Sequence, residues 1–110
     1  MEYYDEITAD QWDIEYASGV AGLNYEDVKE IVHVWAYSPE GWGSMDIELV
    51  LALKDGRFAH FSAWCDTTGW GCQEGASNIN YAASVAELVP EMTADARRRF
   101  GYEETPDVGV

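Results

Sequence analysis

Residues 45–65, MDIELVLALKDGRFAHFSAWC, decide the fold that we expect for this chain. Two runs of aliphatic, β-branched and aromatic residues flank the pair Asp55-Gly56, and such a pair between two apolar runs is a strong short-range signal for a β-hairpin. The stretch therefore predicts two antiparallel strands joined by a tight turn at Asp55 and Gly56.

The length of that turn sets which side chains share a face of the hairpin. A two-residue turn pairs Leu51 with His60 and directs the alternate apolar residues of the first run toward the core. In that register Asp46 and Glu48 point toward water. A three-residue turn shifts the pairing by one position, so the sequence leaves a second register open.

The chain before the hairpin predicts one helix and a further strand. The stretch ITADQWDIEYASG predicts a short helix that Thr8 caps together with Gln11 and that Gly19 ends. Its expected apolar stripe consists of Ile7, Trp12 and Tyr16. A short turn is expected to begin at Asn24, and the β-branched and aromatic residues of 27–38 predict a strand.

The chain after the hairpin predicts two helices. Apolar residues recur at helical spacing in NINYAASVAELVPEM, residues 78–92, and Pro90 is the expected end of this helix. Thr93 then caps a last helix, ADARRRF, which Gly101 closes and which carries three arginines in its final turn.

Together these elements predict an α+β fold: a three-stranded antiparallel β-meander with helices packed on one face, in two layers. We expect residues 1–102 to form a single globular domain, because 110 residues suffice for one core. Residues 103–110 are polar and lack periodicity, which predicts a flexible C-terminal tail.

Charge is the strongest global signal in the sequence. The formal net charge is −15, from 21 acidic and six basic residues. Phosphates of nucleic acids and anionic membranes repel such a chain, so we expect neither direct nucleic-acid binding nor membrane binding. Solubility alone is one explanation of the acidity, and a protein partner with a basic surface is the other.

The sequence also indicates a cytoplasmic protein. No apolar run approaches the roughly 18 to 20 residues of a membrane span. The acidic N-terminal stretch MEYYDEITAD lacks the apolar region of a secretory signal.

Both cysteines lie in the loop WCDTTGWGCQEG, Trp64–Gly75. Their spacing is wider than that of usual zinc or redox pairs, so we expect no metal and no cofactor. A disulfide and a rigid glycine-rich platform remain as alternatives. Catalysis is not expected, because His60, Ser62 and Asp66 do not form a triad in the predicted register.

Two tryptophans flanked by glycines, Trp42 and Trp70, are expected at loop tips. Exposed tryptophans are common anchors of protein interfaces. A role in covering the core is the alternative for both.

The segment from Leu51 to Gly75 resembles a stretch of small uncharacterised phage and prophage proteins that carry a W-C-D-x-T-G-W-x-C-Q loop. In size and acidity the chain also resembles anti-CRISPR and anti-restriction inhibitors, some of which imitate the charge of DNA. This resemblance implies a bacterial host cell and a partner such as a nuclease or a CRISPR surveillance complex.

Nine of the first 30 residues are acidic and one is basic, so the N-terminal third is the expected binding face. The candidate partner-binding carboxylates are Asp5, Glu6, Asp10, Asp13, Glu15, Glu26, Asp27, Glu30, Asp46 and Glu48. The alternative function is a module that binds a small ligand or a metal through the Trp64–Gly75 loop.

Overall fold

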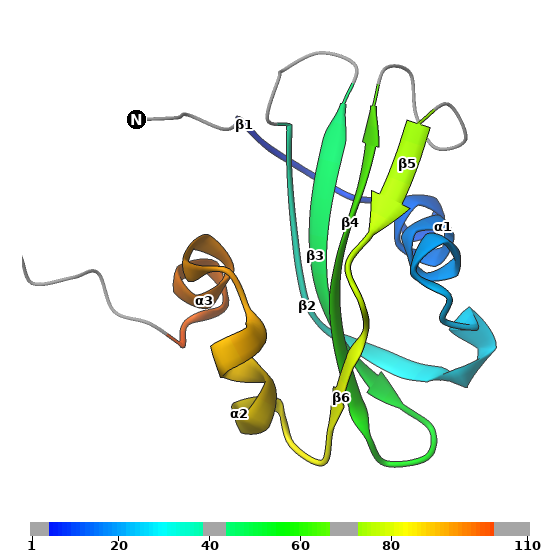
Figure 1. Cartoon of the computed structure of the whole chain (residues 1–110), viewed down its shortest axis with the longest axis vertical. Helices are drawn as coiled ribbons and strands as arrows, with labels where there is room; N and C mark the ends of the chain where they lie inside the picture. Colours follow the sequence, from blue (N-terminus) through cyan, green and yellow to red (C-terminus); the bar gives the residue numbers. More distant parts are fainter. Residues whose placement is uncertain (1–4, 39–43, 67–72, 103–110) are drawn as a thin grey trace, which may run out of the picture.

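A computed structural model describes residues 5–38, 44–66 and 73–102 (Figure 1). Within these residues, six strands form one antiparallel sheet in the order β1-β2-β3-β4-β5, and β6 pairs with β4 as well. The strands are β1 (Asp5–Ile7), β2 (Val28–Ser38), β3 (Met45–Leu53), β4 (Phe58–Asp66), β5 (Gln73–Ala76) and β6 (Asn80–Ala82). The predicted α+β class, helices packed on an antiparallel meander, is confirmed, and the predicted tail at 103–110 lies outside the described residues.

The turn between β3 and β4 has three residues, so the two-residue register is wrong. Leu51 pairs with Ala59 and Val50 pairs with His60. Gly56 has a φ of 94°, and its backbone N–H donates to Leu53 O at 3.1 Å. This is a type I turn followed by a left-handed glycine, the usual three-residue hairpin connection. His60 and the leucines of β3 therefore lie on opposite faces of the sheet.

The N-terminal helix α1 (Gln11–Ala21) begins two residues later than predicted. Asp10 is its N-cap: its carboxylate accepts from Asp13 N at 2.9 Å, while the Asp13 carboxylate accepts from Asp10 N at 3.2 Å. Gly22, with a φ of 94°, ends the helix in place of Gly19. The predicted turn at Asn24 is present as the 3-10 helix η1 (Tyr25–Asp27), which Asn24 caps.

The C-terminal region is strand first and helix second. Residues 80–82 form β6 on the edge of β4, so the helix predicted over 78–92 shortens to α2 (Val85–Leu88) and the 3-10 helix η2 (Val89–Glu91). The last helix, α3 (Ala94–Phe100), is confirmed. Thr93 caps it, and Gly101 ends it with a φ of 87°.

The helices divide between the two faces of the sheet instead of lying on one face as predicted, because β3 presents apolar side chains on both sides (Figure 1). On one face α1 covers a core of alternate residues from β3 and β4, including Leu49, Leu51 and Phe61. On the other face α2, η2 and α3 cover Trp35 and Val50 with a second set of apolar residues, Leu88, Met92 and Ala96. The central strand β3 is consequently buried on both sides.

Candidate functional site

The outward side of α1 carries two large aromatic residues. Ile14, Ala17 and Ser18 are buried against the sheet, whereas the side chains of Trp12 and Tyr16 are 58% and 38% exposed. The two rings lie one helical turn apart with centroids 5.1 Å from each other. The predicted core-facing stripe of Ile7, Trp12 and Tyr16 is therefore wrong: Ile7 lies in β1 and packs against the core, whereas Trp12 and Tyr16 face solvent.

Carboxylates surround these rings. Asp10 is exposed at the N-cap of α1, Glu15 is exposed on α1, and Glu74 is exposed on the neighbouring strand β5. Gln11 Nε2 donates to Glu15 Oε2 at 3.0 Å, which orients that carboxylate along the helix. We call this surface the α1 patch, and we define it by Gln11, Trp12, Glu15, Tyr16, Gly19, Val20 and Glu74.

Two shallow hollows lie on the α1 patch. The first, of about 430 Å³, is lined by Gln11, Trp12, Glu15 and Tyr16. The second, of about 410 Å³, is lined by Glu15, Tyr16, Gly19, Val20 and Glu74. Each hollow combines an aromatic ring with at least one carboxylate, and the two share Glu15 and Tyr16.

The η1 turn extends the acidic surface beyond α1. Glu26 and Asp27 are exposed there, on the same side of the sheet as α1, and Glu30 is exposed at the start of β2 (Figure 1). Burial, and secondarily the charge of Glu15, raises the pKa of Tyr25 in the middle of η1. The carboxylate of Glu15 therefore acts electrostatically on η1 as well as on α1.

The other predicted acidic residues separate into different surroundings. Asp5 and Glu6 lie in β1, paired with Ser38 and Tyr37. Asp46 is half-buried near the end of β3. Burial raises the pKa of the Cys65 thiol, and the charges of Asp13, Asp46 and Asp66 add to this effect.

Glu48 is not a surface residue, and this expectation is wrong. It is 1% exposed, because the helices of the second face cover it. Its Oε2 atom accepts from His60 Nε2 at 2.7 Å and from Thr93 N at 3.1 Å, and its Oε1 atom accepts from Thr93 Oγ1 at 2.9 Å. Through these hydrogen bonds Glu48 connects Thr93, the N-cap of α3, to the centre of the sheet.

His60 is a structural residue in this arrangement. Its Nε2 atom contacts Glu48, and its Nδ1 atom lies 3.3 Å from Asn80 Nδ2. Because the Glu48 carboxylate only accepts, Nε2 carries the proton and Nδ1 accepts from the asparagine. Both ring nitrogens are engaged inside the fold, so His60 does not serve as a base toward a surface substrate.

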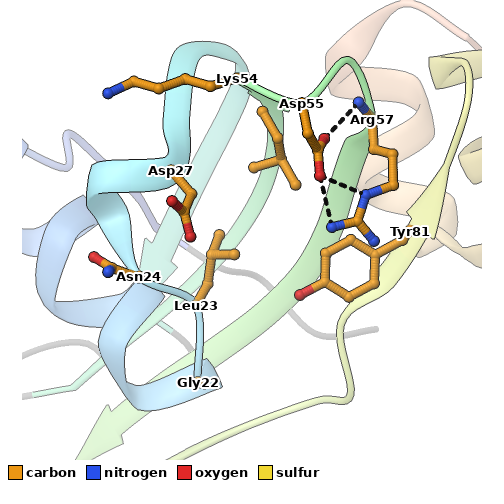
Figure 2. A pocket seen from close by; sticks show the side chains of 9 residues that line it. Gly22, Leu23, Asn24, Asp27, Lys54, Asp55, Arg57 and Tyr81 are labelled. Atoms are coloured by element: carbon orange, nitrogen blue, oxygen red, sulfur yellow. Dashed lines mark hydrogen bonds and ion pairs between the residues drawn. The ribbon is translucent and has the colours of Figure 1, made fainter.

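A separate cleft of about 570 Å³ lies where the end of α1 and η1 meet the β3–β4 turn and β6 (Figure 2). The Asp55 carboxylate accepts from the Arg57 backbone N–H and from its guanidinium at 2.8 to 2.9 Å. The Arg57 backbone and side-chain hydrogen bonds lower the pKa of Asp55. The guanidinium carbon also lies 4.5 Å from the centroid of the Tyr81 ring. Arginine, carboxylate and aromatic ring form one unit, from which Lys54 extends away (Figure 2).

The cysteine loop is described only in part. Cys65 is a buried free thiol, whereas Cys72, Trp70 and Trp42 lie outside the described residues. Trp64 is 43% exposed and lies across Gly75 on β5. A Cβ atom at Gly75 would come within 2.7 Å of Trp64 Nε1, so the glycine leaves room for the indole.

Within residues 5–38, 44–66 and 73–102, no group of three histidine, cysteine, aspartate or glutamate side chains is placed to hold a metal ion. No helix in this part of the chain is long and apolar enough to cross a membrane. No protein-family model, curated protein or solved structure matches the chain. The role of the α1 patch therefore rests on its own chemistry.

Sequence reasoning placed Glu15 on a binding face but missed the exposure of Trp12 and Tyr16 beside it. The signal was a second stripe in the same helix, Ile14, Ala17 and Ala21, which has the same helical spacing as the aromatic stripe. Only one stripe of a surface helix faces the core. The small residues of the second stripe permit close packing on the sheet, which leaves the rings outside.

Proposed function

We propose that this chain is an acidic protein-binding inhibitor of the phage type, which docks on a basic, nucleic-acid-binding surface of a host defence complex. RNA-guided nucleases and restriction enzymes are the expected class of partner. The observation that carries the proposal is the solvent side of α1, where exposed carboxylates and two exposed aromatic rings lie together.

The charge supports both attraction and competition. A net charge of −15 on 110 residues steers the protein toward a positive surface at long range. A channel of lysines and arginines binds nucleic acid by releasing counterions from the phosphates. Carboxylates held on a folded surface compete for the same cations, so the protein would displace nucleic acid without resembling its bases.

The aromatic residues supply binding free energy that exposed charges alone do not. Exposed ion pairs contribute only about 0 to 1 kcal/mol each, and salt screens them. A tryptophan or tyrosine buried at the centre of an interface contributes about 2 kcal/mol or more. Trp12 and Tyr16 line a hollow together with Glu15, where an interface would bury them.

The test measures binding of a labelled DNA duplex to purified RNA-guided nucleases and restriction enzymes by fluorescence anisotropy, with and without this protein. We expect the protein to displace DNA from at least one of them, and we expect its affinity to fall as the salt concentration rises. The protein alone is expected not to bind the duplex. Displacement from none of the enzymes at low salt would contradict the proposal.

A matched pair of variants separates the proposed face from general acidity. Glu15→Gln/Glu26→Gln removes two charges from the α1 side, and Glu87→Gln/Glu91→Gln removes two from α2 and η2 on the opposite face of the sheet. We expect the first variant to lose about 3- to 10-fold in affinity and the second to lose little. Equal losses would indicate that only net charge matters.

A further inference from the structure

We propose that the cleft beside the β3–β4 turn binds a small zwitterion with an apolar side chain, which is the chemistry of a free α-amino acid or a short apolar peptide. The volume of the cleft is about 570 Å³, within the range of about 300 to 1,000 Å³ that is typical of small-molecule sites. None of the residues that line the cleft belongs to the α1 patch, so its ligand is independent of the proposed function.

The walls of the cleft are connected to one another before a ligand binds. Lys54 N donates to Asp27 O at 2.9 Å, which joins the β3–β4 turn to η1. Leu53 N donates to Arg57 O at 2.8 Å and closes the turn itself. The third wall, β6, is held in place by its pairing with β4. Because the site is preformed, binding a ligand costs less conformational entropy than it would at a flexible surface.

Two leucines and a tyrosine give the cleft its apolar surface. Leu23 and Leu53 line it and are buried, and both belong to the core beneath α1. Tyr81 lines it from β6 and is exposed. An apolar side chain of a ligand that contacts these residues is removed from water, which favours binding.

Arg57 is a fixed anion-binding group at one side of the cleft. Asp55 Oδ2 accepts from its Nε at 2.9 Å and from its Nη2 at 2.8 Å, and its guanidinium carbon lies 4.5 Å from the centroid of the Tyr81 ring. A guanidinium has five N–H donors, so these contacts orient the group and leave donors for a carboxylate of a ligand.

Asp27 offers the opposite charge. Asp27 and Arg57 line opposite sides of the cleft (Figure 2). Within residues 5–38, 44–66 and 73–102, the carboxylate of Asp27 accepts no hydrogen bond from the protein. An ammonium group is the complement of such a carboxylate, because it combines opposite charge with three donors.

The charges around the cleft favour a zwitterion over a simple ion. Two acidic residues, Asp27 and Asp55, and two basic residues, Lys54 and Arg57, line it, whereas the whole chain has a net charge of −15. The chain as a whole repels an anion, and a simple cation leaves the donors of Arg57 unused. A ligand with its ammonium at Asp27 and its carboxylate at Arg57 satisfies both groups.

The probes are leucine, phenylalanine and the dipeptide leucyl-leucine, each titrated to about 10 mM into isotope-labelled protein near neutral pH. The amide resonances of η1, the β3–β4 turn and β6 report binding. N-acetyl-leucine lacks the ammonium, and leucinamide lacks the carboxylate. We expect leucine to bind at least about threefold tighter than either control. Tighter binding of the dipeptide than of leucine would assign a peptide as the ligand, and the reverse order would assign a free amino acid.

Two outcomes of these titrations would overturn the proposal. One is the absence of resonance changes at the cleft with all three zwitterions. The other is binding of leucinamide or N-acetyl-leucine that is as tight as binding of leucine, since one of the two charged contacts would then contribute nothing.

Variants locate the two ends of the ligand. We expect Asp27→Asn to weaken leucine at least about threefold and to leave N-acetyl-leucine unchanged. Arg57→Gln is expected to weaken leucine more than leucinamide. Lys54→Gln removes a charge that extends away from the cleft (Figure 2) and is the matched control, with no change expected. Equal losses of leucine and N-acetyl-leucine in Asp27→Asn would contradict the assigned contact.

These results are distinct from those that test the proposed function. Binding of a zwitterion without displacement of DNA from any enzyme would refute the proposed function alone. Displacement of DNA without binding of any zwitterion would refute the ligand of the cleft alone.

Discussion

Replacing Glu48 by alanine removes the acceptor of three hydrogen bonds inside the fold. One donor, His60 Nε2, is buried with it at 2.7 Å, and the other two belong to Thr93 at the start of α3. A buried donor without an acceptor costs about 1 to 3 kcal/mol. Thr93 is exposed, so its two donors can form hydrogen bonds with water instead, and the free-energy cost at this residue is smaller. With the lost packing, we expect Glu48→Ala to lower the free energy of unfolding by about 3 to 5 kcal/mol.

Glu48→Gln is the conservative comparison. The amide oxygen can still accept from His60 Nε2 and Thr93 N, whereas the amide NH2 replaces the acceptor that faces Thr93 Oγ1. The hydroxyl can then accept from the amide, because an oxygen of this type has two lone pairs. We expect a loss of about 1 to 2 kcal/mol, which corresponds to the exchange of charge-assisted hydrogen bonds for neutral ones.

Urea unfolding followed by tryptophan fluorescence and far-UV circular dichroism measures both changes. With a slope of about 1.5 kcal/mol per molar urea, Glu48→Ala lowers the midpoint by about 2 to 3 M. Glu91→Gln removes an exposed carboxylate and is expected to change stability by less than about 0.5 kcal/mol. A midpoint for Glu48→Ala that matches Glu91→Gln would refute the view that this carboxylate links the sheet to α3.

The remaining predictions concern four further properties of the fold. Burial lowers the pKa of His33, so on acidification the imidazole is protonated at a higher pH in the unfolded chain than in the folded protein. The free energy of unfolding should therefore decline as the pH falls below about 6.5. In thermal melts His33→Phe should show a smaller decline than the wild type, and an identical decline would contradict this. Burial first, and then neighbouring carboxylates, raise the pKa of Cys65, so in a Cys72→Ser background iodoacetamide should modify it more slowly than a free thiol until denaturant is added. Gly75→Ala should cost about 1 kcal/mol and shift the indole resonance of Trp64, since the new Cβ approaches Nε1 to 2.7 Å; unchanged stability and resonance would count against the contact. Because the net charge is −15, the melting temperature should rise between low salt and about 0.3 M NaCl, and a constant value would show that self-repulsion is unimportant.

The sequence was sufficient for the three central strands β2, β3 and β4 and for both ends of α3. The Asp55-Gly56 turn, the strand over 28–38, the Thr93 cap and the Gly101 end are all present. These features depend on local chemistry: glycines at positive φ, side chains that accept from helix N–H groups, and runs of β-branched residues. They can therefore be recognised without knowledge of the tertiary structure.

The register of the hairpin was not decided by local chemistry. Asp-Gly fits both a two-residue turn and the last two positions of a three-residue turn. In the structure the Asp55 carboxylate accepts from Arg57 N at 2.9 Å, which favours the longer turn. The one-residue difference moves His60 from the leucine core to the opposite face, beside Glu48.

The environments of Glu48 and of Trp12 depended on packing between distant segments. In β3 the run Leu49–Leu53 is apolar at every position, which is typical of a strand covered on both faces. The isolated glutamate before it was interpreted as a surface residue, although a buried carboxylate with three donors is also stable. In α1 the stripe of small residues that contains Ala17 and Ser18 packs against the sheet. The sequence of the helix alone does not indicate that this stripe, and not the aromatic one, is buried.

The burial of β3 on both faces has a consequence for how this protein can change. Substitutions in its central strand disturb two cores at once, so the scaffold there has little freedom. The acidic side chains of α1, η1 and β5 are, apart from their caps, independent of those cores. Evolution or an experimenter can therefore exchange them one at a time, and the charge of this side of the molecule changes while the framework beneath stays the same.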